Sequence, residues 1–299
     1  MEPRLAQHKI VVAVLCAIAI AFLCPCTTLA QDQLMYDQYR DLSFYNPSVS
    51  NVDGKYSHFV QVWSHAAIAP KKYIRRYHSE TYEDINVGAR YQGRKDGHLF
   101  SASYHYDGYS FFHQHTVGLG YGYEFVFKNI HRLSVGGRLQ VNFCDIMPDN
   151  LSVQTEWLKS FQMTPDFDLG MQYRLRGLNV GIAVVNIAGN SAANNTALIM
   201  YERRGYFNIS YDFALGKEKN VILSPHLLMY LGQHTVSADF GAEINLWKYA
   251  HAGYTFRIQE MRHIVTAGME YKGFVLDLAY EGAAQTRKQR MQVSLGYKF

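Results

Sequence analysis

The chain has 299 residues, a formal net charge of +4 at pH 7, and 48% hydrophobic residues. That charge does not favour a nucleic-acid partner. Because three of the four cysteines lie within residues 1–30, the rest of the chain cannot form an intrachain disulfide. The 23 tyrosines and 17 phenylalanines suit β-strands and the two boundaries between lipid and water.

Residues 1–30 are predicted to be a cleaved signal peptide. Two basic residues precede an uncharged run at 10–23, and small residues at 28–30 provide a cleavage site. The alternative of a membrane anchor is disfavoured, because a spanning helix needs about 20 apolar residues. A lipoprotein signal ending at Cys24 or Cys26 is also disfavoured, because the residues before these cysteines are poor substitutes for the small ones that lipoprotein processing needs.

Residues 56–299 contain fourteen stretches in which apolar and polar side chains alternate. Successive side chains of a strand point to opposite faces, so this period suits a wall with lipid outside and water inside. The predicted strands are 56–63, 85–91, 99–106, 116–127, 132–143, 166–175, 178–187, 205–215, 221–231, 235–246, 249–258, 263–271, 274–281 and 289–299. We therefore predict an all-β fold, a 14-stranded antiparallel transmembrane β-barrel of the bacterial outer membrane.

The connections between these strands alternate in length. Those after the first four odd strands are long, at 64–84, 107–115, 144–165 and 188–204, whereas those after even strands are short, as at 128–131. Outer-membrane barrels have short periplasmic turns and longer extracellular loops, so both termini are expected in the periplasm. The alternative, a soluble β-sandwich, offers no reason for long loops on every second connection.

Charged side chains on the polar faces are predicted to point into the lumen: Arg90, Glu124, Arg138, Asp168, Arg174, Asp212, Asp239, Glu243, Arg257, Glu270, Asp277 and Lys298. Because both signs occur, ion pairs are expected across the interior in place of a pore selective for one sign. A barrel of this size encloses more width than an eight-stranded one, whose side chains fill it. Residues 31–55 do not alternate and are assigned to a periplasmic N-terminal segment, which either docks to partners or folds into the lumen.

Several short motifs follow one another in a characteristic order. They are Gln31-Asp32 with Phe44-Tyr45-Asn46-Pro47, Val60-Gln61-Val62-Trp63, Tyr106-Asp107-Gly108, Tyr121-Gly122-Tyr123, Leu133-Ser134-Val135-Gly136-Gly137, Pro165-Asp166-Phe167-Asp168-Leu169-Gly170, Val180-Gly181-Ile182-Ala183-Val184 and Gly253-Tyr254-Thr255-Phe256-Arg257. In order and spacing, these motifs resemble the PorP/SprF family of type IX secretion system membrane proteins, over essentially the whole chain after the signal peptide. The chain departs from the family pattern at Ser48, where alanine is usual, and at Arg290-Met291, where His-Glu is usual.

The resemblance implies a component that helps exported proteins cross the outer membrane or attach to the cell surface, as in protein secretion or the export of gliding adhesins. Its implied partners are periplasmic ring and lipoprotein components of the secretion machinery and the exported surface proteins themselves. The departures bear on the subfamily role and not on the barrel. The alternative function is a passive diffusion channel or a transporter of small hydrophobic ligands.

The candidate partner-binding residues are Asn46, Pro47, Trp63, Lys71, Lys72, Arg75, Arg76, Asp107 and Gly108. The four basic residues form a run in the first long loop, interleaved with tyrosines. Such a run can contact anionic lipopolysaccharide or an exported protein. The alternative is a solvated loop with no partner.

The sequence supplies no clear catalytic or metal site. His113 and His115 are the closest histidine pair, but their spacing is not that of a helical metal site and no cysteine or carboxylate cluster adjoins them. A solvated aromatic loop is the preferred interpretation. The Gly-x-Ser-x-Gly motif of many hydrolases is missing from the sequence. We therefore expect a protein that is not an enzyme and needs no cofactor.

Overall fold

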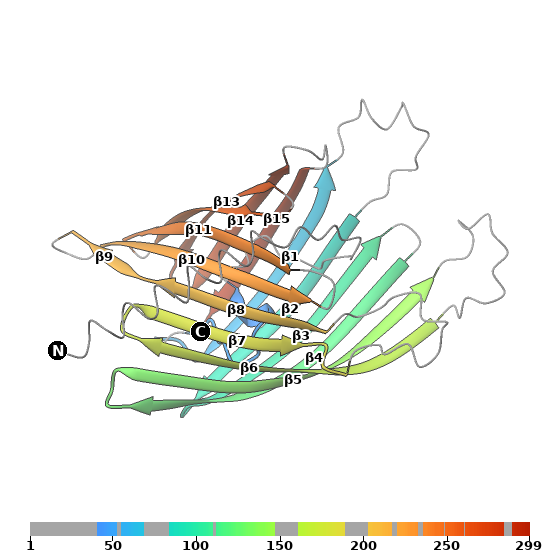
Figure 1. Ribbon diagram of the computed structural model, residues 1–299, viewed down its shortest axis with the longest axis horizontal. Helices are drawn as coiled ribbons and strands as arrows, with labels where there is room; N and C mark the ends of the chain where they lie inside the picture. The colour runs from blue at the N-terminus through green and yellow to red at the C-terminus, as the bar shows by residue number, and fades with distance from the viewer. Residues whose placement is uncertain are drawn as a thin grey trace.

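The computed structural model describes residues 41–52, 55–68, 84–109, 112–146, 161–188, 203–216, 220–232, 236–247, 249–259, 261–283 and 289–299. Within these ranges, one sheet curls round and closes on itself (Figure 1). A short 3₁₀ helix, η1 (Leu42–Phe44), lies inside the curved sheet. In the described ranges, no helix has the length and apolar character needed to cross a membrane.

The strands are β1 (His58–Ile68), β2 (Asp84–Lys95), β3 (His98–Tyr109), β4 (Phe112–Phe127), β5 (His131–Ile146), β6 (Phe161–Leu175), β7 (Leu178–Val185), β8 (Arg204–Tyr211), β9 (Phe213–Leu215), β10 (Val221–Gly232), β11 (Val236–Leu246), β12 (Ala250–Arg257), β13 (Arg262–Tyr271), β14 (Phe274–Ala283) and β15 (Gln289–Lys298). Neighbours along the chain pair antiparallel, and β15 returns to pair with β1. β8 and β9 both pair with β10 and are separated by Asp212 alone, so they form one interrupted strand. The described chain is thus a closed 14-strand antiparallel barrel, which confirms the predicted fold.

Each predicted strand has a counterpart, but several strands are longer than the sequence indicated. β5 continues to Ile146, so Cys144 lies in a strand and not in a loop. The predicted long loop at 107–115 is wrong, because β3 runs to Tyr109 and β4 already begins at Phe112. Asp-Gly is a common pair in hairpin turns, yet Asp107 and Gly108 are both paired with β4 in the ladder.

The two faces of the wall differ as a membrane barrel requires. Leu119 and Leu139 are 65% and 71% exposed on the outer face, whereas Asp168 and Arg257 are fully buried on the inner face. Apolar side chains meet hydrocarbon outside, and charged side chains need partners or water inside. The charges predicted for the lumen therefore lie on the face that the alternation indicated.

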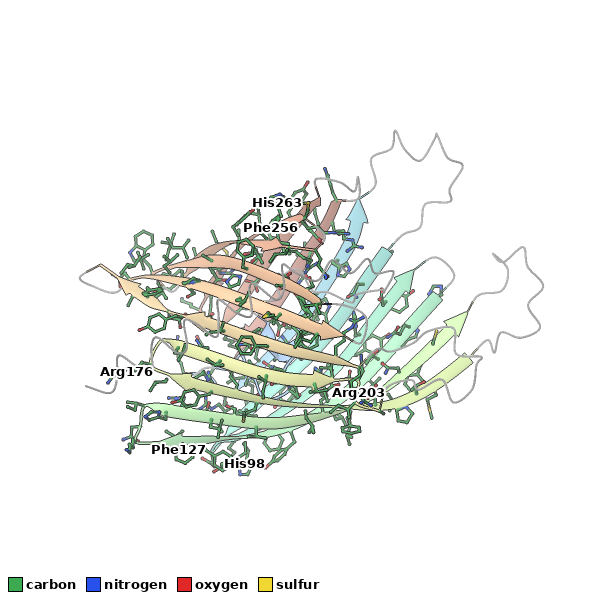
Figure 2. The ribbon with its side chains drawn as sticks, viewed as in Figure 1. His98, Phe127, Arg176, Arg203, Phe256 and His263 are labelled. Atoms are coloured by element: carbon green, nitrogen blue, oxygen red, sulfur yellow. The ribbon has the colours of Figure 1, made fainter. Side chains whose placement is uncertain are left out.

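The short hairpins lie at the same end of the barrel as the start of β1 and the end of β15. Asp96-Gly97 and Lys272-Gly273 join strands with positive φ at both turn residues, as two-residue hairpins prefer. Ser57, just before β1, donates its backbone N–H to the carbonyl of Phe299 (3.1 Å) at the same end. The longest connections, such as 69–83 and 147–160, leave the strands at the opposite end; Arg176 and Arg203 mark the two ends in Figure 2.

Candidate functional site

Residues 41–52, here called the lumen segment, lie within the barrel and contact its inner wall (Figure 1). η1 forms the first turn of this segment, and a second turn follows in which the backbone N–H of Val49 donates to the carbonyl of Asn46 (3.0 Å). Its contacts reach β2, β5, β6, β7, β8 and β10. The lumen segment and the wall that holds it form the candidate functional site.

A buried ion pair joins the lumen segment to β2. Asp41 and Arg90 are 2% and 6% exposed, and Nη1 of Arg90 donates to Oδ1 of Asp41 at 2.5 Å. The same guanidinium contacts Oε1 of Gln61 and Oγ of Ser43, and Ser43 itself donates to Asp41 (2.8 Å). A buried charge pair is stable only when further hydrogen bonds satisfy it, and this pair has them.

Arg138 joins the lumen segment to β5 and β6. Its Nη2 donates to the carbonyl of Phe44 (2.8 Å), and its Nε donates to Oδ2 of Asp168 (2.8 Å). Asp168 also accepts a hydrogen bond from the side chain of Gln140. The arginine thus satisfies a carbonyl at the end of η1 and a fully buried carboxylate with one side chain.

Asn46 fits against the backbone of β6 and β7. Its side-chain amide donates to the carbonyls of Met171 (3.1 Å) and Ile182 (3.4 Å), while its Oδ1 accepts from the backbone N–H of Ser48 (3.1 Å). The close approach depends on Gly170, where a Cβ atom would lie 2.0 Å from Oδ1 of Asn46. The turn at Asn46 therefore fits against β6 because Gly170 has no side chain.

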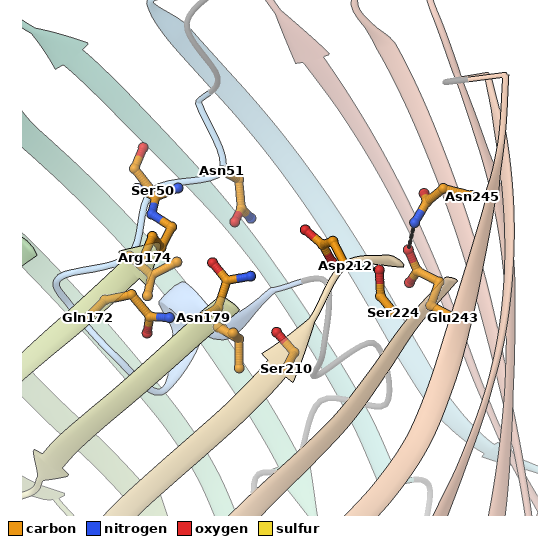
Figure 3. A pocket seen from close by; sticks show the side chains of 12 residues that line it. Ser50, Asn51, Gln172, Arg174, Asn179, Ser210, Asp212, Ser224, Glu243 and Asn245 are labelled. Carbon is orange, nitrogen blue, oxygen red and sulfur yellow. Dashed lines mark hydrogen bonds between the residues drawn. The ribbon is translucent and has the colours of Figure 1, made fainter. Parts of the chain in front are cut away.

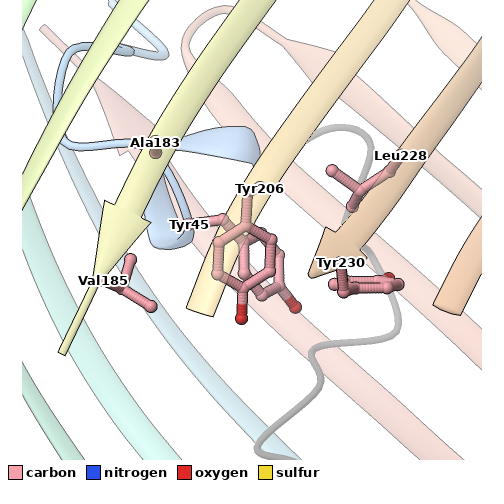
Figure 4. Close-up of a cluster of buried hydrophobic side chains, with 6 residues drawn as sticks. All are labelled: Tyr45, Ala183, Val185, Tyr206, Leu228 and Tyr230. Carbon is pink, nitrogen blue, oxygen red and sulfur yellow. The ribbon is translucent and has the colours of Figure 1, made fainter. Parts of the chain in front are cut away.

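Tyr45 places an apolar cluster inside the polar lumen (Figure 4). Its ring centroid is 5.0 Å from that of Tyr206 and 6.4 Å from that of Tyr230. The other buried members are Ala183, Val185 and Leu228, from β7 and β10. Tyr230 also donates its hydroxyl to Oδ2 of Asp239 (2.6 Å), which links the cluster to the charged wall.

Two buried glutamates each gather several arginines. Glu124 lies within ion-pair distance of Arg94, Arg132 and Arg174. Near the other end of the barrel, Glu281 lies close to Arg257 (3.6 Å), Arg262 (2.9 Å) and Arg290 (3.9 Å). The expected pairing of opposite charges across the interior is therefore present among the described residues.

A polar cavity of about 280 Å³ separates the lumen segment from the wall (Figure 3). Ser50 and Asn51 border it on the segment side. Arg174 lies across it from Asp212 and Glu243, and Glu243 accepts a hydrogen bond from Asn245 (2.8 Å). Among the described residues, no group of three or more His, Cys, Asp or Glu side chains could hold a metal ion.

The predicted partner-binding residues fall in three places. Asn46, Pro47 and Trp63 lie inside the barrel, where the Trp63 ring is 6.4 Å from that of Phe44 and beneath the Arg90 guanidinium. Asp107-Gly108 lies in β3. The basic residues of the first long connection, Lys71, Lys72, Arg75 and Arg76, lie outside the described residues.

The sequence indicated the residues of the barrel wall in this site better than those of the lumen segment. Arg90 and Arg138 stand out as charges on polar faces, but nothing local indicates that their partners are Asp41 and the carbonyl of Phe44. Tyr45 appears in the Phe44-Tyr45-Asn46-Pro47 motif without a sign of its aromatic neighbours. The one feature of the sequence that could have indicated a buried Tyr45 is its position as an aromatic residue next to a turn in a polar segment.

A model of the type IX secretion system membrane protein family PorP/SprF matches residues 28–297. The chain belongs to the PorP/SprF family. The comparison with curated proteins finds no match. Membership in the PorP/SprF family agrees with the resemblance drawn from the motifs, and it identifies this barrel as an outer-membrane component of type IX secretion.

Solved outer-membrane barrels share the fold of this PorP/SprF protein. The toluene transporter TbuX of Ralstonia pickettii has a TM-score of 0.54 at 10% identity, over 85% of this chain and 92% of that one. Omp33 of Acinetobacter baumannii has a TM-score of 0.50 at 10% identity, over 82% and 98%. The toluene transporter TodX of Pseudomonas putida has a TM-score of 0.50 at 8% identity, over 92% and 95%. At these identities, the likeness is one of fold alone.

Proposed function

We propose that this protein is a non-enzymatic component of type IX secretion that works by binding. On one side it would hold periplasmic ring and lipoprotein components, and on the other it would contact exported surface proteins. Family membership supports a place in the secretion machinery. No bond is made or broken in this role, and it needs no cofactor.

The orientation that we propose has both termini in the periplasm and the long connections outside the cell. The short hairpins, the start of β1 and the end of β15 share one end of the barrel. Short turns on the periplasmic side are the rule for bacterial barrels. The basic run at 71–76 would then face lipopolysaccharide or an exported protein, while Asp107-Gly108 would lie close to the same outer surface.

The observation that carries the proposal is the lumen segment. The inner wall uses a buried ion pair at Asp41 and Arg90, the guanidinium of Arg138, and backbone carbonyls beside Asn46 to hold it. A passive channel would keep such polar groups for solvent and solute. We infer that Asn46, Pro47 and Trp63 act on partners indirectly, by fixing the position of the lumen segment in the barrel.

Affinity capture from outer membranes tests this proposal. A chain lacking residues 31–40 keeps the lumen segment, and we expect it to form a heat-modifiable barrel that no longer retains ring or lipoprotein components. Its matched control replaces the same ten positions with a Gly/Ser linker of equal length, which separates loss of contacts from loss of reach. Full retention of these partners by both variants would contradict a docking role for the N-terminal segment.

The second candidate function is a channel or a transporter of small hydrophobic ligands. Its support is the likeness in fold to proteins described as toluene transporters. Ten of the twelve residues that line the cavity beside the lumen segment carry amide, hydroxyl or charged side chains, and the other two are Leu42 and Val49. Such a lining suits water better than a hydrocarbon. Planar-bilayer recording separates the two functions, since steady large conductance from the pure protein would favour the channel.

A further inference from the structure

Tyrosine–histidine pairs recur on the outer face of the barrel. Each pair joins neighbouring strands by a hydrogen bond of 2.5 to 2.8 Å between the tyrosine hydroxyl and Nδ1 of the histidine. In every pair the tyrosine lies two residues before the register partner of the histidine. In the described chain the pairs are His58–Tyr91, His98–Tyr121, Tyr104–His115, Tyr106–His113, His131–Tyr173 and Tyr254–His263.

The pairs lie near the two ends of the strands. His98 is near the end with short hairpins, whereas His263 is near the opposite end (Figure 2). Rings with a polar tip are favoured where a barrel passes from hydrocarbon to headgroups. The pairs therefore mark the two boundaries of the membrane-facing band.

Two of the pairs form one continuous surface on the β3–β4 hairpin. We call Tyr104, Tyr106, His113 and His115 the Tyr–His ladder. Tyr106 is hydrogen-bonded to His113 (2.5 Å), and its ring centroid is also 5.0 Å from that of His115. Tyr104 is hydrogen-bonded to His115 (2.8 Å). The ladder lies at the end of the barrel that carries the long connections, so the histidine pair of the sequence is part of a built surface and not of a loop.

Gly108 makes the ladder possible. It is the register partner of His113, and a Cβ atom at Gly108 would lie 2.7 Å from the hydroxyl oxygen of Tyr106. The missing side chain lets the Tyr106 ring lean along the strand toward His113. A glycine of the Tyr106-Asp107-Gly108 motif thus serves the outer surface.

The ladder leaves two imidazole nitrogens for an outside ligand. Nδ1 of His113 and Nδ1 of His115 each bond a tyrosine hydroxyl, and no described residue bonds the Nε2 atom of either ring. When the tyrosine O–H donates to a neutral imidazole, the ring proton is on Nε2; a protonated imidazole also carries one there. In that tautomer the two rings present two N–H donors on one face of β4, which suit an anionic ligand with several oxygens, such as a phosphate.

The surroundings of the ladder indicate where that phosphate is attached. Val117 and Leu119 continue the same face of β4 and are 43% and 65% exposed to hydrocarbon. A free anion gains nothing from such neighbours, whereas a lipid places acyl chains against them and its headgroup against the rings.

We propose that the Tyr–His ladder binds the phosphate group of a membrane lipid. In the proposed orientation this lipid is in the outer leaflet, and its chemical class is the phosphorylated, acylated glucosamine disaccharide at the base of lipopolysaccharide. The inference does not depend on a role in secretion. It rests on the barrel, the orientation and the geometry of four rings.

Native mass spectrometry of the full chain in detergent tests the proposal. The protein is titrated with bisphosphorylated lipid A and with dephosphorylated lipid A of the same acyl chains. The variant His113→Phe/His115→Phe keeps both rings on an apolar face and removes both Nε2 donors. We expect it to lose about tenfold in preference for the phosphorylated lipid, since hydrogen bonds to a charged group are the strong ones.

Matched controls separate the ladder from general changes of the outer face. His98→Phe/His131→Phe removes two histidines of the same pair geometry at the other end, and its preference should equal that of the unchanged protein. Gly108→Ala moves Tyr106 and should weaken the preference while both histidines remain. Mobility before and after heating in gel electrophoresis checks that every variant is a folded barrel.

Three results would overturn the proposal. The first is a ladder variant that keeps the full preference for phosphorylated lipid. The second is equal loss in the control at the other end. The third is displacement of the lipid by millimolar inorganic phosphate, which would make the free anion the ligand.

Discussion

Asp41 and Arg90 form a buried ion pair that joins the lumen segment to β2, across 49 positions of sequence. Both side chains are almost fully excluded from solvent, at 3% and 4% exposure. Neither residue therefore has water to replace its partner. This ion pair therefore fixes the start of the lumen segment against β2.

Asp41→Asn should loosen the lumen segment. The change leaves the guanidinium of Arg90 buried without its charged partner, at a cost of about 3–5 kcal/mol. Hydrogen exchange of a peptide covering residues 41–52 measures the effect, and we expect faster exchange there with β4 unchanged. The double variant Asp41→Asn/Arg90→Met removes both charges and should recover part of the protection. Exchange equal to the unchanged protein in the single variant would contradict the role given to the pair.

Gly170→Ala should displace the turn at Asn46. The added Cβ atom would lie 2.0 Å from Oδ1 of Asn46, so either the asparagine or the strand must move. Limited proteolysis in detergent should then cleave near Asn46, within a barrel that remains heat-modifiable. Gly205→Ala is the matched control, because its nearest neighbour atom would be 3.5 Å away. Equal protease resistance of the two variants would rule out a tight fit at Gly170.

Tyr45→Ala should weaken the packing of the lumen segment against β8 and β10. Removing a buried aromatic side chain costs about 3 kcal/mol through lost burial and the cavity left behind. Tyr45→Phe keeps the ring and should pack nearly as well. Quenching of a fluorophore attached at position 50 reports how far the segment leaves the wall. Identical quenching in the alanine and phenylalanine variants would argue against the aromatic cluster as an anchor.

Arginine on the outer face should destabilise the barrel according to depth. Leu139, 71% exposed near the middle of β5, faces hydrocarbon, and Leu139→Arg should cost about 2–4 kcal/mol. Tyr271 lies beside the Lys272-Gly273 hairpin, where Tyr271→Arg should cost about 0–1 kcal/mol. Guanidinium titration in lipid vesicles measures both. Equal costs at the two depths would show that the band does not lie where the exposed residues place it.

Much of the wall could be predicted from alternation alone. The stretch predicted at 235–246 corresponds to β11 at Val236–Leu246, because successive side chains there face the outside and the lumen of the barrel in turn. The prediction at 107–115 was wrong for a local reason. Asp107-Gly108 is a strong turn signal, yet ladder pairing with β4 and the space that Tyr106 needs keep both residues in the strand.

The candidate site was less predictable, because its contacts join distant parts of the chain. Arg138 meets the carbonyl of Phe44 across 94 positions, and Asn46 meets Met171 across 125. Periodicity reports which face a side chain occupies and says nothing of its partner on that face. The lumen segment has no period at all, so its two possible positions, at the periplasmic mouth or inside the barrel, were equally compatible with its residues.

The amino-acid sequence by itself determined the strands, the face of each side chain and the family, because period two and motif spacing are local properties of a chain. Only the tertiary structure decided that residues 41–52 lie against the inner wall and that His113 and His115 share a surface with Tyr104 and Tyr106. Both outcomes depend on register and closure of the barrel, which bring together residues that no local pattern relates.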